Sequence, residues 1–359
     1  MKKTISLLLV FVMILTIVTA CKPNGNKSEY SEGLNFISNG DGTCYVRGIG
    51  SCTDSIIKIP PTSPDGDTVV AIGVFGNKPH IVEVIIPDSV ETIYACAFEN
   101  CTSLKSVKLP EGIEAIAGGV FSGCSSLESI VIPDSVTQIF EYAFENCTSL
   151  KDVRLPTGLK KLDGFQGCTA LESITIPEGV EKIYNDAFSG CSSLKSISIP
   201  DSVEQIGYFV FSGCNSLTSI SVSENNLYYK TVNGNLYSKD GTTLVCYAAG
   251  NPNTTFKIPD GVTDIYNGLF NGCTKLKSVV IPDGITWINY SMFAGCSSLE
   301  SVVIPDSVVG IEFYAFSECS SLKDVYYTGS EDEWSKIAIY PGNSVLENAT
   351  VHYNYVPGN

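Results

Sequence analysis

Nine of the fourteen cysteines recur at an almost constant spacing and carry the most evident chemistry in the chain. Successive members stand 23 residues apart, with one step of 21 and one of 59. They are Cys101, Cys124, Cys147, Cys168, Cys191, Cys214, Cys273, Cys296 and Cys319. As thiolates they could bind metal or exchange disulfides. As buried thiols they would pack like small apolar side chains, and lone cysteines on stacked coils have parallel Cβ vectors that do not converge on a disulfide. We therefore expect buried free thiols and no metal, and leave a bond between Cys44 and Cys52 open.

The chain is poor in the groups that most enzymes and nucleic-acid binders use. It has two histidines, His80 and His352, and its 38 acidic and 22 basic side chains give a net charge of −16. Nucleic-acid phosphates are bound by clustered Lys and Arg, so this balance argues against nucleic acid as a partner. No nucleophile elbow, phosphate-binding loop, His-Glu-x-x-His or Cys-x-x-Cys motif occurs. We predict a protein that is not an enzyme, with no catalytic residues and no cofactor.

Two charged rows share the same period. The residue after each repeated proline is acidic, except at Thr157: Asp88, Glu111, Asp134, Glu178, Asp201, Asp260, Asp283 and Asp306. This row favours either a track for cations such as calcium or simple turn chemistry, because Asp is common beside Pro in turns. A second row alternates in sign: Lys105, Glu128, Lys151, Glu172 and Lys195, then Lys277, Glu300 and Lys323. Exposed ion pairs contribute less than about 1 kcal/mol each, so we expect them to fix strand register.

A further row is aromatic. Between the last isoleucine of a repeat and its Phe lie Tyr94, Phe140, Tyr142, Tyr184, Tyr208, Phe209, Tyr266, Tyr290, Phe313 and Tyr314, which we call the aromatic arc. Its rings could simply fill the outer corner of the fold. Rings that stay exposed would instead form a surface of the kind that binds proteins and glycans. We select Tyr184, Tyr208, Tyr266 and Tyr290 as candidate ligand-binding residues.

The 23-residue period also predicts the elements that carry these rows. In the first cysteine-containing repeat, Val107 and Leu109 alternate with polar residues, which is typical of a strand with one buried face. Pro110 lacks an amide hydrogen and ends that strand. Ile113 and Ile116 then predict a short helical or 3₁₀ stretch that leads to the next Phe-x-x-Cys corner. One repeat cannot bury its own apolar side, so about ten coils should stack around a shared core.

These repeats read Ile-Pro-x-x-Val-x-x-Ile-x-x-x-Ala-Phe-x-x-Cys-x-x-Leu, a pattern that resembles the BspA-like leucine-rich-repeat family of bacterial surface proteins. The resemblance implies an α/β fold: a strand-rich leucine-rich-repeat solenoid with a parallel β-sheet, short helical or 3₁₀ turns and a β-hairpin insertion. It also implies the division of the chain into an N-terminal cap at 34–71, repeats at 72–222, a hairpin insertion at 223–258, repeats at 259–324 and a C-terminal cap at 325–359. The pair Asp240-Gly241 suits the tight turn of that hairpin.

The N-terminus has the pattern of an export signal. Lys2 and Lys3 precede an apolar run that ends at Val18 and is too short to span a bilayer comfortably. The run closes with Val-Thr-Ala-Cys21, which resembles the lipobox of bacterial lipoproteins, although an ordinary secretory signal is the alternative. We predict a signal peptide at 1–20 and a lipidated Cys21 that opens a flexible tether at 21–33. The membrane would then be contacted through the lipid anchor only.

Together these features favour a lipid-anchored protein exposed on the bacterial cell envelope. Its expected role is adhesion or ligand capture, with the solenoid as the surface that binds an extracellular protein or glycan, host molecules included. The alternative is an envelope scaffold protein that binds the cell's own surface components. The step from fold to role is an analogy, because leucine-rich solenoids bind many kinds of partner.

Overall fold

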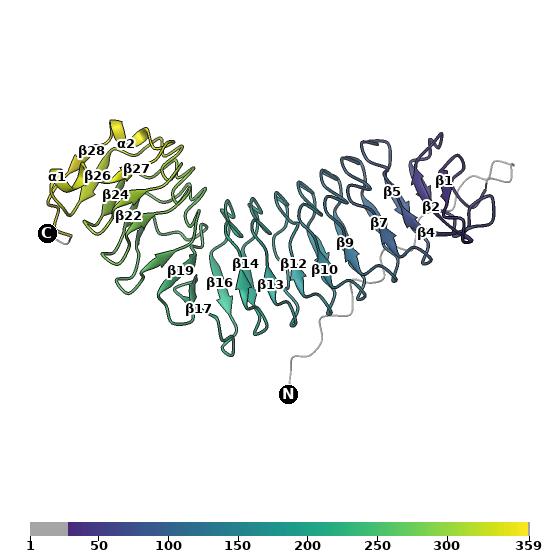
Figure 1. Ribbon diagram of the computed structural model, residues 1–359, viewed down its shortest axis with the longest axis horizontal. Coiled ribbons are helices and arrows are strands. Elements are labelled where there is room, and N and C mark those ends of the chain that lie inside the picture. Colours follow the sequence, from purple (N-terminus) through teal and green to yellow (C-terminus); the bar gives the residue numbers. More distant parts are fainter. Residues whose placement is uncertain (1–27, 358–359) are drawn as a thin grey trace.

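A computed structural model describes residues 28–357, which form one long, curved solenoid (Figure 1). Each coil contributes a strand, turns at the repeated proline, adds a second and shorter strand, and returns through the Phe-x-x-Cys corner. The coils follow one another along the axis in sequence order, from the purple N-terminal end to the yellow C-terminal end. Residues that are one period apart therefore lie on neighbouring coils.

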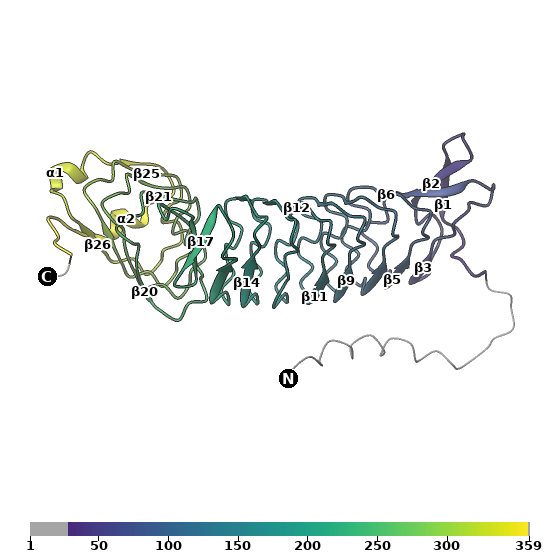
Figure 2. The ribbon, with the colours of Figure 1, turned by 90° about the horizontal axis from the view of Figure 1, so that it is seen from below.

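Strands form two rows, which lie along opposite edges of the solenoid in Figure 2. The main row contains β3 (Ile56–Lys58), β5 (Glu83–Ile85), β7 (Ser106–Lys108), β9 (Ser129–Val131), β11 (Asp152–Arg154), β14 (Ser196–Ile199), β16 (Ser219–Val222), β20 (Thr255–Lys257), β22 (Ser278–Val280), β24 (Ser301–Ile304), β26 (Asp324–Tyr327) and β28 (Thr350–His352). The short row contains β2 (Thr43–Gly48), β4 (Thr68–Ile72), β6 (Thr92–Ile93), β8 (Ala115–Ile116), β10 (Gln138–Ile139), β12 (Lys161–Leu162), β13 (Lys182–Ile183), β15 (Gln205–Ile206), β19 (Thr243–Cys246), β21 (Asp264–Ile265), β23 (Trp287–Ile288), β25 (Gly310–Ile311) and β27 (Ala338–Ile339). Outside the rows are β1 (Asn35–Ser38), β17 (Tyr229–Val232), β18 (Asn235–Ser238), and the helices α1 (Glu331–Trp334) and α2 (Val345–Asn348).

Most neighbouring strands within a row pair in parallel and in register, but in the main row β7 does not pair with β9, nor β11 with β14, nor β16 with β20. Ile197 of β14 faces Ile220 of β16, and Val279 of β22 faces Val302 of β24. Along β14 the serines are exposed and the isoleucines are buried, as the alternating pattern predicted. The strand-rich, parallel leucine-rich-repeat solenoid is therefore confirmed.

The solenoid has about 13 turns, more than the ten coils expected. The extra turns come from the two ends and the insertion, because each adds a strand that pairs in parallel with a repeat. At the N-terminal end β2 pairs with β4, in the insertion β19 pairs with β21, and at the C-terminal end β26 pairs with β28. The segments without the cysteine motif continue the same stack.

The stretch before each Phe-x-x-Cys corner is not helical, contrary to expectation. Within residues 28–357 the only helices are α1 and α2, of four residues each. The corners contain left-handed residues such as Cys96 (φ 58°) and Asn100 (φ 56°), which interrupt a right-handed helix. The amide of Phe98 between them donates to Val120 on the next coil instead of to a residue one turn back. The corner is thus held by bonds between coils together with single turns, such as the bond from the amide of Ala97 to the carbonyl of Tyr94.

The repeated cysteines and phenylalanines form the centre of the core. The thiol of Cys124 donates a hydrogen bond to the carbonyl oxygen of Phe98, and that of Cys147 to the carbonyl of Phe121. All nine repeat cysteines are buried and free, as predicted, and so are Cys44 and Cys52. Burial raises the pKa of Cys147 to about 12, which keeps it a neutral thiol.

The insertion separates two hydrophobic cores. One extends from the N-terminal end to Ala248, and the other from Tyr237 to Leu346. The stacked Phe rings, 5.1 to 5.9 Å apart from Phe75 to Phe211, stop at this boundary. There the ring of Tyr247 takes a place in the stack, 5.2 Å from Phe270. The insertion is therefore built into the solenoid and contributes side chains to both cores.

Candidate functional site

The aromatic arc occupies the corner that follows the short row of strands. Three of its rings belong to left-handed residues two positions before the repeated Phe: Tyr142 (φ 60°), Phe209 (φ 57°) and Tyr314 (φ 59°). Glycine fits that backbone freely, whereas a bulky side chain there costs on the order of 1 kcal/mol. Gly119 and Gly268 occupy the same position in other coils. The backbone conformation at this position therefore favours glycine and does not explain why aromatic residues occur there.

Three of the four predicted ligand-binding tyrosines lie in one aromatic patch. Tyr208 and Tyr266 have ring centroids 4.9 Å apart, and Tyr290 contacts both Phe209 and Tyr314 edge to face at 6.2 Å. Tyr208 and Tyr290 are 45% and 40% exposed, whereas Tyr266 is half-buried. We define the aromatic patch as Tyr208, Phe209, Tyr266, Trp287, Tyr290, Phe313, Tyr314 and Tyr340.

The fourth predicted residue, Tyr184, lies apart from this patch. Its half-buried ring is covered by the amine of Lys182, which sits 4.5 Å from the ring centroid. That geometry is a cation–π contact within the protein. Tyr184 instead lines a separate hollow at a corner of the arc that is shorter than most of the others.

Two members of the patch were not predicted. Tyr340 contacts Phe313 at 4.9 Å and Trp287 at 6.4 Å, and all three are exposed. Trp287 stands on β23 at a position that is Gln138 and Lys182 in other coils. The sequence therefore did contain a sign that Trp287 belongs to the patch, because it is aromatic at a strand position that is polar in other coils. Tyr340 lies in the segment predicted to be the C-terminal cap, where the repeat pattern gives no such comparison.

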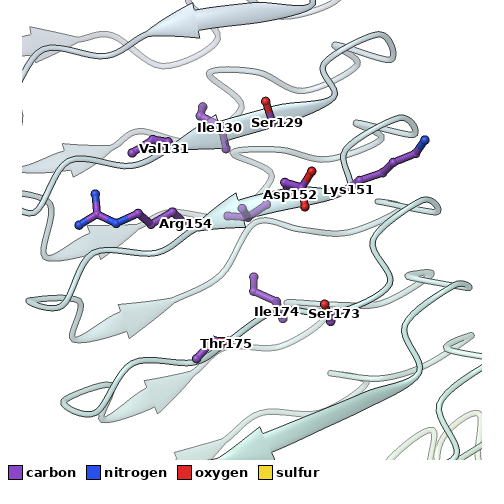
Figure 3. A pocket seen from close by; sticks show the side chains of 10 residues that line it. Ser129, Ile130, Val131, Lys151, Asp152, Arg154, Ser173, Ile174 and Thr175 are labelled. Atoms are coloured by element: carbon purple, nitrogen blue, oxygen red, sulfur yellow. The ribbon is translucent and has the colours of Figure 1, made fainter. Parts of the chain in front are cut away.

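The outer face of the main row carries a shallow polar hollow of about 290 Å³ (Figure 3). Asp152 and Arg154 of β11, with Lys151 just before the strand, are among the residues that line it. The Arg154 guanidinium already forms an ion pair with Asp134 at 2.9 Å. Serine and threonine side chains make up much of the remaining surface, so this face offers few anchors for a partner.

The charged rows form only some of the expected pairs. Lys195 pairs with Glu172, and Lys277 pairs with Glu300 at 2.9 Å. In the acidic row, Asp88 and Asp260 have lysine partners besides the Asp134 pair with arginine. These pairs are exposed and contribute little to stability. Within residues 28–357 no cluster of three or more His, Cys, Asp or Glu side chains could hold a metal ion.

Beside this hollow the main row is interrupted. Residues 173–176, the segment between β11 and β14, make no backbone–backbone hydrogen bond to either neighbour. Figure 3 shows Ser173, Ile174 and Thr175 on this segment next to β11. We call this interruption the seam. It follows a coil whose corner is two residues short, since Leu162 and Phe165 are three positions apart where Ile139 and Phe144 are five; Ile72 and Phe75 in the first repeat share this short spacing.

That short corner leaves a hollow of about 550 Å³ on the arc side, which we call the notch. Glu141 and Tyr142 form one wall, Lys182, Tyr184, Asn185 and Asp186 form the other, and Asp163 and Gln166 line the floor. Tyr142 is 48% exposed at the mouth of this hollow. The turn is closed by Gly164, whose φ of 95° and contact distance to Phe140 leave no room for a side chain.

The notch is acidic and contains a buried carboxyl. Asp163 is only 7% exposed; its Oδ1 accepts hydrogen bonds from the amide of Gly164 and the side chain of Gln166. Burial, with added repulsion from Glu141 and Asp186, raises the pKa of Asp163 to about 6. Burial also raises the pKa of Asp186. The side-chain oxygen of Gln166 is buried without a hydrogen-bond partner. Three carboxyl groups thus face one amine, that of Lys182.

Comparison with known proteins matches the repeats to a defined family. Six copies of the BspA-type leucine-rich repeat region match residues 68–164, 162–232 and 245–354. A leucine-rich cell surface protein from Faecalibacterium prausnitzii is similar in structure, with 28% identity, 88% of this chain and 98% of that chain covered, and a TM-score of 0.66. The pneumococcal vaccine antigen PcpA shares the fold, with 19% identity, coverage of 92% and 88%, and a TM-score of 0.64. None of the curated proteins compared matches the chain.

The described part of the chain was also compared with the requirements of a membrane-spanning helix. No helix within residues 28–357 combines the length and apolar character needed to cross a bilayer.

Proposed function

The chain belongs to the BspA-type leucine-rich repeat family, and on that premise we propose that it is a bacterial surface protein that binds an extracellular protein or glycan through the aromatic patch. The family supports an interaction role. The similar protein from Faecalibacterium prausnitzii is a cell surface protein, which supports the same location here.

The observation that carries the proposal is a set of exposed and half-buried rings in three contacting groups: Tyr208 with Tyr266, Tyr290 with Phe209 and Tyr314, and Tyr340 with Trp287 and Phe313. Tyr290, Phe313 and Tyr314 are each 40% or more exposed, and their neighbours hold them in place by edge-to-face and tilted contacts. Aromatic side chains dominate the binding energy of protein interfaces, because they bury a large area with few rotatable bonds. The outer face of the main row is rich in serine and has a smaller aromatic group, Tyr326 with His352 and Tyr355, at its C-terminal end.

Attachment to the envelope belongs to the same proposal. Cys21, the predicted lipidation site, lies outside the described residues. A diacylated terminus there would supply the two-chain anchoring that a single acyl chain does not. The solenoid would then extend from the membrane on the 21–33 tether.

The proposal is tested with the purified protein on an array of immobilised fibrinogen, fibronectin, laminin, collagen, mucin and bacterial polysaccharides. A variant with Tyr290, Phe313 and Tyr314 changed to alanine should lose at least about tenfold in affinity for the molecules that the parent binds. The matched control changes Lys108 and Arg154 to alanine on the outer face of the main row, and should bind normally. Thermal melting of each variant separates lost contact from lost folding.

Two results would reverse the proposal. If the aromatic variant binds as tightly as the parent while the control loses binding, the site is on the main row. If the protein binds only polysaccharides purified from its own envelope, the alternative role as an envelope scaffold replaces adhesion.

A further inference from the structure

The corners of the solenoid are joined by a regular backbone hydrogen bond that is missing at the notch. In most full-length corners the left-handed residue donates its amide to a carbonyl on the next coil; besides Tyr142 at the notch, Phe209, beside the insertion, is the exception among residues 28–357. Examples are Gly119 to Glu141, Asp186 to Tyr208 and Gly268 to Tyr290, at 3.0 to 3.3 Å. The short corner lacks the two residues that would align with Glu141 and Tyr142. The peptide bond between those two residues, with its carbonyl and its amide, is therefore missing from the stack of corners.

This absence leaves two backbone groups, one on each side of the short corner, without a backbone hydrogen-bond partner within residues 28–357. Among the backbone hydrogen bonds of residues 28–357, none involves the amide of Tyr142 or the carbonyl oxygen of Asn185. In a full-length corner, the carbonyl and the amide of one intervening peptide bond would pair with both. Tyr142 and Asn185 are two coils apart, which corresponds to about 10 Å at the usual strand spacing of about 4.8 Å. That gap accommodates one extended chain.

The side chains around the gap favour a positive charge. Glu141, Asp163 and Asp186 outnumber the single amine of Lys182, and the exposed face of Tyr142 stands at the same opening. Carboxylates next to an aromatic ring form the usual surroundings of an arginine or lysine side chain, which pairs with the acids and packs on the ring.

We propose that the notch binds a short peptide segment of a protein partner, whose backbone replaces the missing peptide unit between Tyr142 and Asn185 and whose arginine or lysine side chain pairs with Asp163, Asp186 and Glu141. The partner's carbonyl accepts a hydrogen bond from the amide of Tyr142, and its amide donates to the carbonyl of Asn185. This inference deepens the proposed function by naming a protein partner, and it assigns that partner a site separate from the aromatic rings of Tyr290 and Tyr314.

The probe is acetyl-Gly-Arg-Gly-amide, and its binding to the purified protein is measured by calorimetry or ligand-observed NMR. The neutral isostere with citrulline in place of arginine should bind about tenfold more weakly, because it loses the charge pairing. The peptide with N-methylated arginine should also lose about tenfold, because it lacks the amide that donates to Asn185. Equal binding of all three peptides would overturn the proposal. Saturation of the notch by neutral methyl glycosides, with no peptide binding, would show a glycan site instead.

An insertion variant tests the missing unit directly. Placing Glu-Gly between Asp163 and Gly164 restores the 23-residue spacing, fills the gap, and should abolish peptide binding. The control places Glu-Gly between Asp65 and Gly66, where a side chain would meet open space, and should bind normally. The substitutions Glu141→Gln and Asp186→Asn provide a second route if the insertion variant does not fold. Each should weaken binding about threefold or more. Unchanged affinity in the folded insertion variant would overturn the proposal.

The pH dependence gives an independent readout. The other charged groups that face Asp163 are Glu141 and Asp186, from the two neighbouring coils, and Lys182. Protonation of Asp163 removes one negative charge from the notch, so peptide affinity should fall about threefold or more between pH 7.5 and pH 5. The Asp163→Asn variant should not show that fall, and a fall of equal size in it would contradict the assigned role of Asp163.

Failure of this inference is distinguishable from failure of the proposed function. The variant with Tyr290, Phe313 and Tyr314 changed to alanine should still bind the arginine peptide at full affinity. Loss of array binding in that variant tests the aromatic patch alone. Loss of peptide binding on insertion at Asp163 tests the notch alone.

Discussion

The thiol of Cys191 donates a hydrogen bond to the main-chain carbonyl oxygen of Phe165, 26 residues earlier, at 3.2 Å. The same contact recurs in most coils, for example from Cys214 to Phe188 and from Cys319 to Phe293. A neutral S–H is required for it, and burial supplies that state by raising the pKa of Cys191 to about 12. The cysteine row is therefore a ladder of weak hydrogen bonds between coils.

Replacing Cys191 tests this ladder. We expect Cys191→Ala to lower the free energy of unfolding by about 1–2 kcal/mol, since it leaves a small void and removes the donor. Cys191→Ser should cost less than that, because its hydroxyl can still donate to the carbonyl of Phe165. Urea denaturation gives both values, and Cys96→Ala, at a partly exposed thiol, is the matched control. A serine variant less stable than the alanine variant would show that the hydrogen bond has no role.

The same burial makes the repeat thiols unreactive. At pH 8, iodoacetamide should label the partly exposed Cys96 well before Cys147 or Cys191, whose thiol pKa is about 12. After denaturation without reductant, all thirteen cysteines from Cys44 to Cys319 should become labelled. Peptide mass spectrometry counts them. Repeat cysteines that stay blocked until a reductant is added would reveal disulfides and contradict the assignment.

The short corner should depend on glycine at position 164. A Cβ there would stand 2.7 Å from the carbonyl oxygen of Phe140, and the left-handed φ of 95° adds strain. We expect Gly164→Ala to cost about 2 kcal/mol or more of unfolding free energy. Gly261→Ala is the control, because a Cβ at that residue meets nothing within 4 Å, and its effect should stay within about 0.5 kcal/mol. Equal melting temperatures for the two variants would show that the turn tolerates a side chain.

Stability should depend on pH through Asp163. Its pKa is about 6 in the folded chain against 3.8 in the reference state, so between pH 4 and pH 6 the folded chain holds a proton that the unfolded chain has released. Folding stability therefore falls as the pH rises through that window, by up to about 3 kcal/mol. Asp163→Asn removes this titration, so the variant should gain stability over the parent at pH 7, and the gain should shrink below pH 4. Urea midpoints at both pH values measure it, and a gain of the same size at both would contradict the shifted pKa.

Membrane attachment is expected to require Cys21. The Cys21→Ala variant should appear as soluble or unprocessed protein, because no thiol remains for acylation at the end of the apolar run. Detergent partitioning combined with mass spectrometry of the N-terminal peptide distinguishes the forms. If the variant still partitions into detergent as a cleaved and acylated chain, the anchor is elsewhere.

The period of the sequence was sufficient to predict the stack of coils, because a residue that recurs every 23 positions has one place in each turn. The buried faces of Val107 and Leu109 and the burial of the cysteines followed from it. The corners were not predicted correctly. The sequence shows Ile113 and Ile116 at a helical spacing, but hydrogen bonds to the next coil and left-handed residues such as Asn100 prevent a helix there.

The candidate sites were predicted less completely than the fold. The tyrosines of the arc could be read directly, but contacts such as that of Phe313 with Tyr340 depend on how the last repeat meets the C-terminal cap. The step of 21 residues was visible between Cys147 and Cys168. Its consequence was not, since only the hydrogen-bond register shows that the amide of Tyr142 loses its partner.

The seam at residues 173–176 also determines how the molecule responds to mechanical load. A solenoid transmits tension along its axis from coil to coil. At residues 173–176 no backbone hydrogen bond of the main row carries that tension to the neighbouring strands. The short row remains bonded at the same level, where β12 pairs with β13. The main row is unpaired at a second level, between β7 and β9, where β8 and β10 of the short row stay paired. Pulling on the two ends should therefore open one edge at these two levels while the other edge holds, so that the rod bends there before any coil detaches.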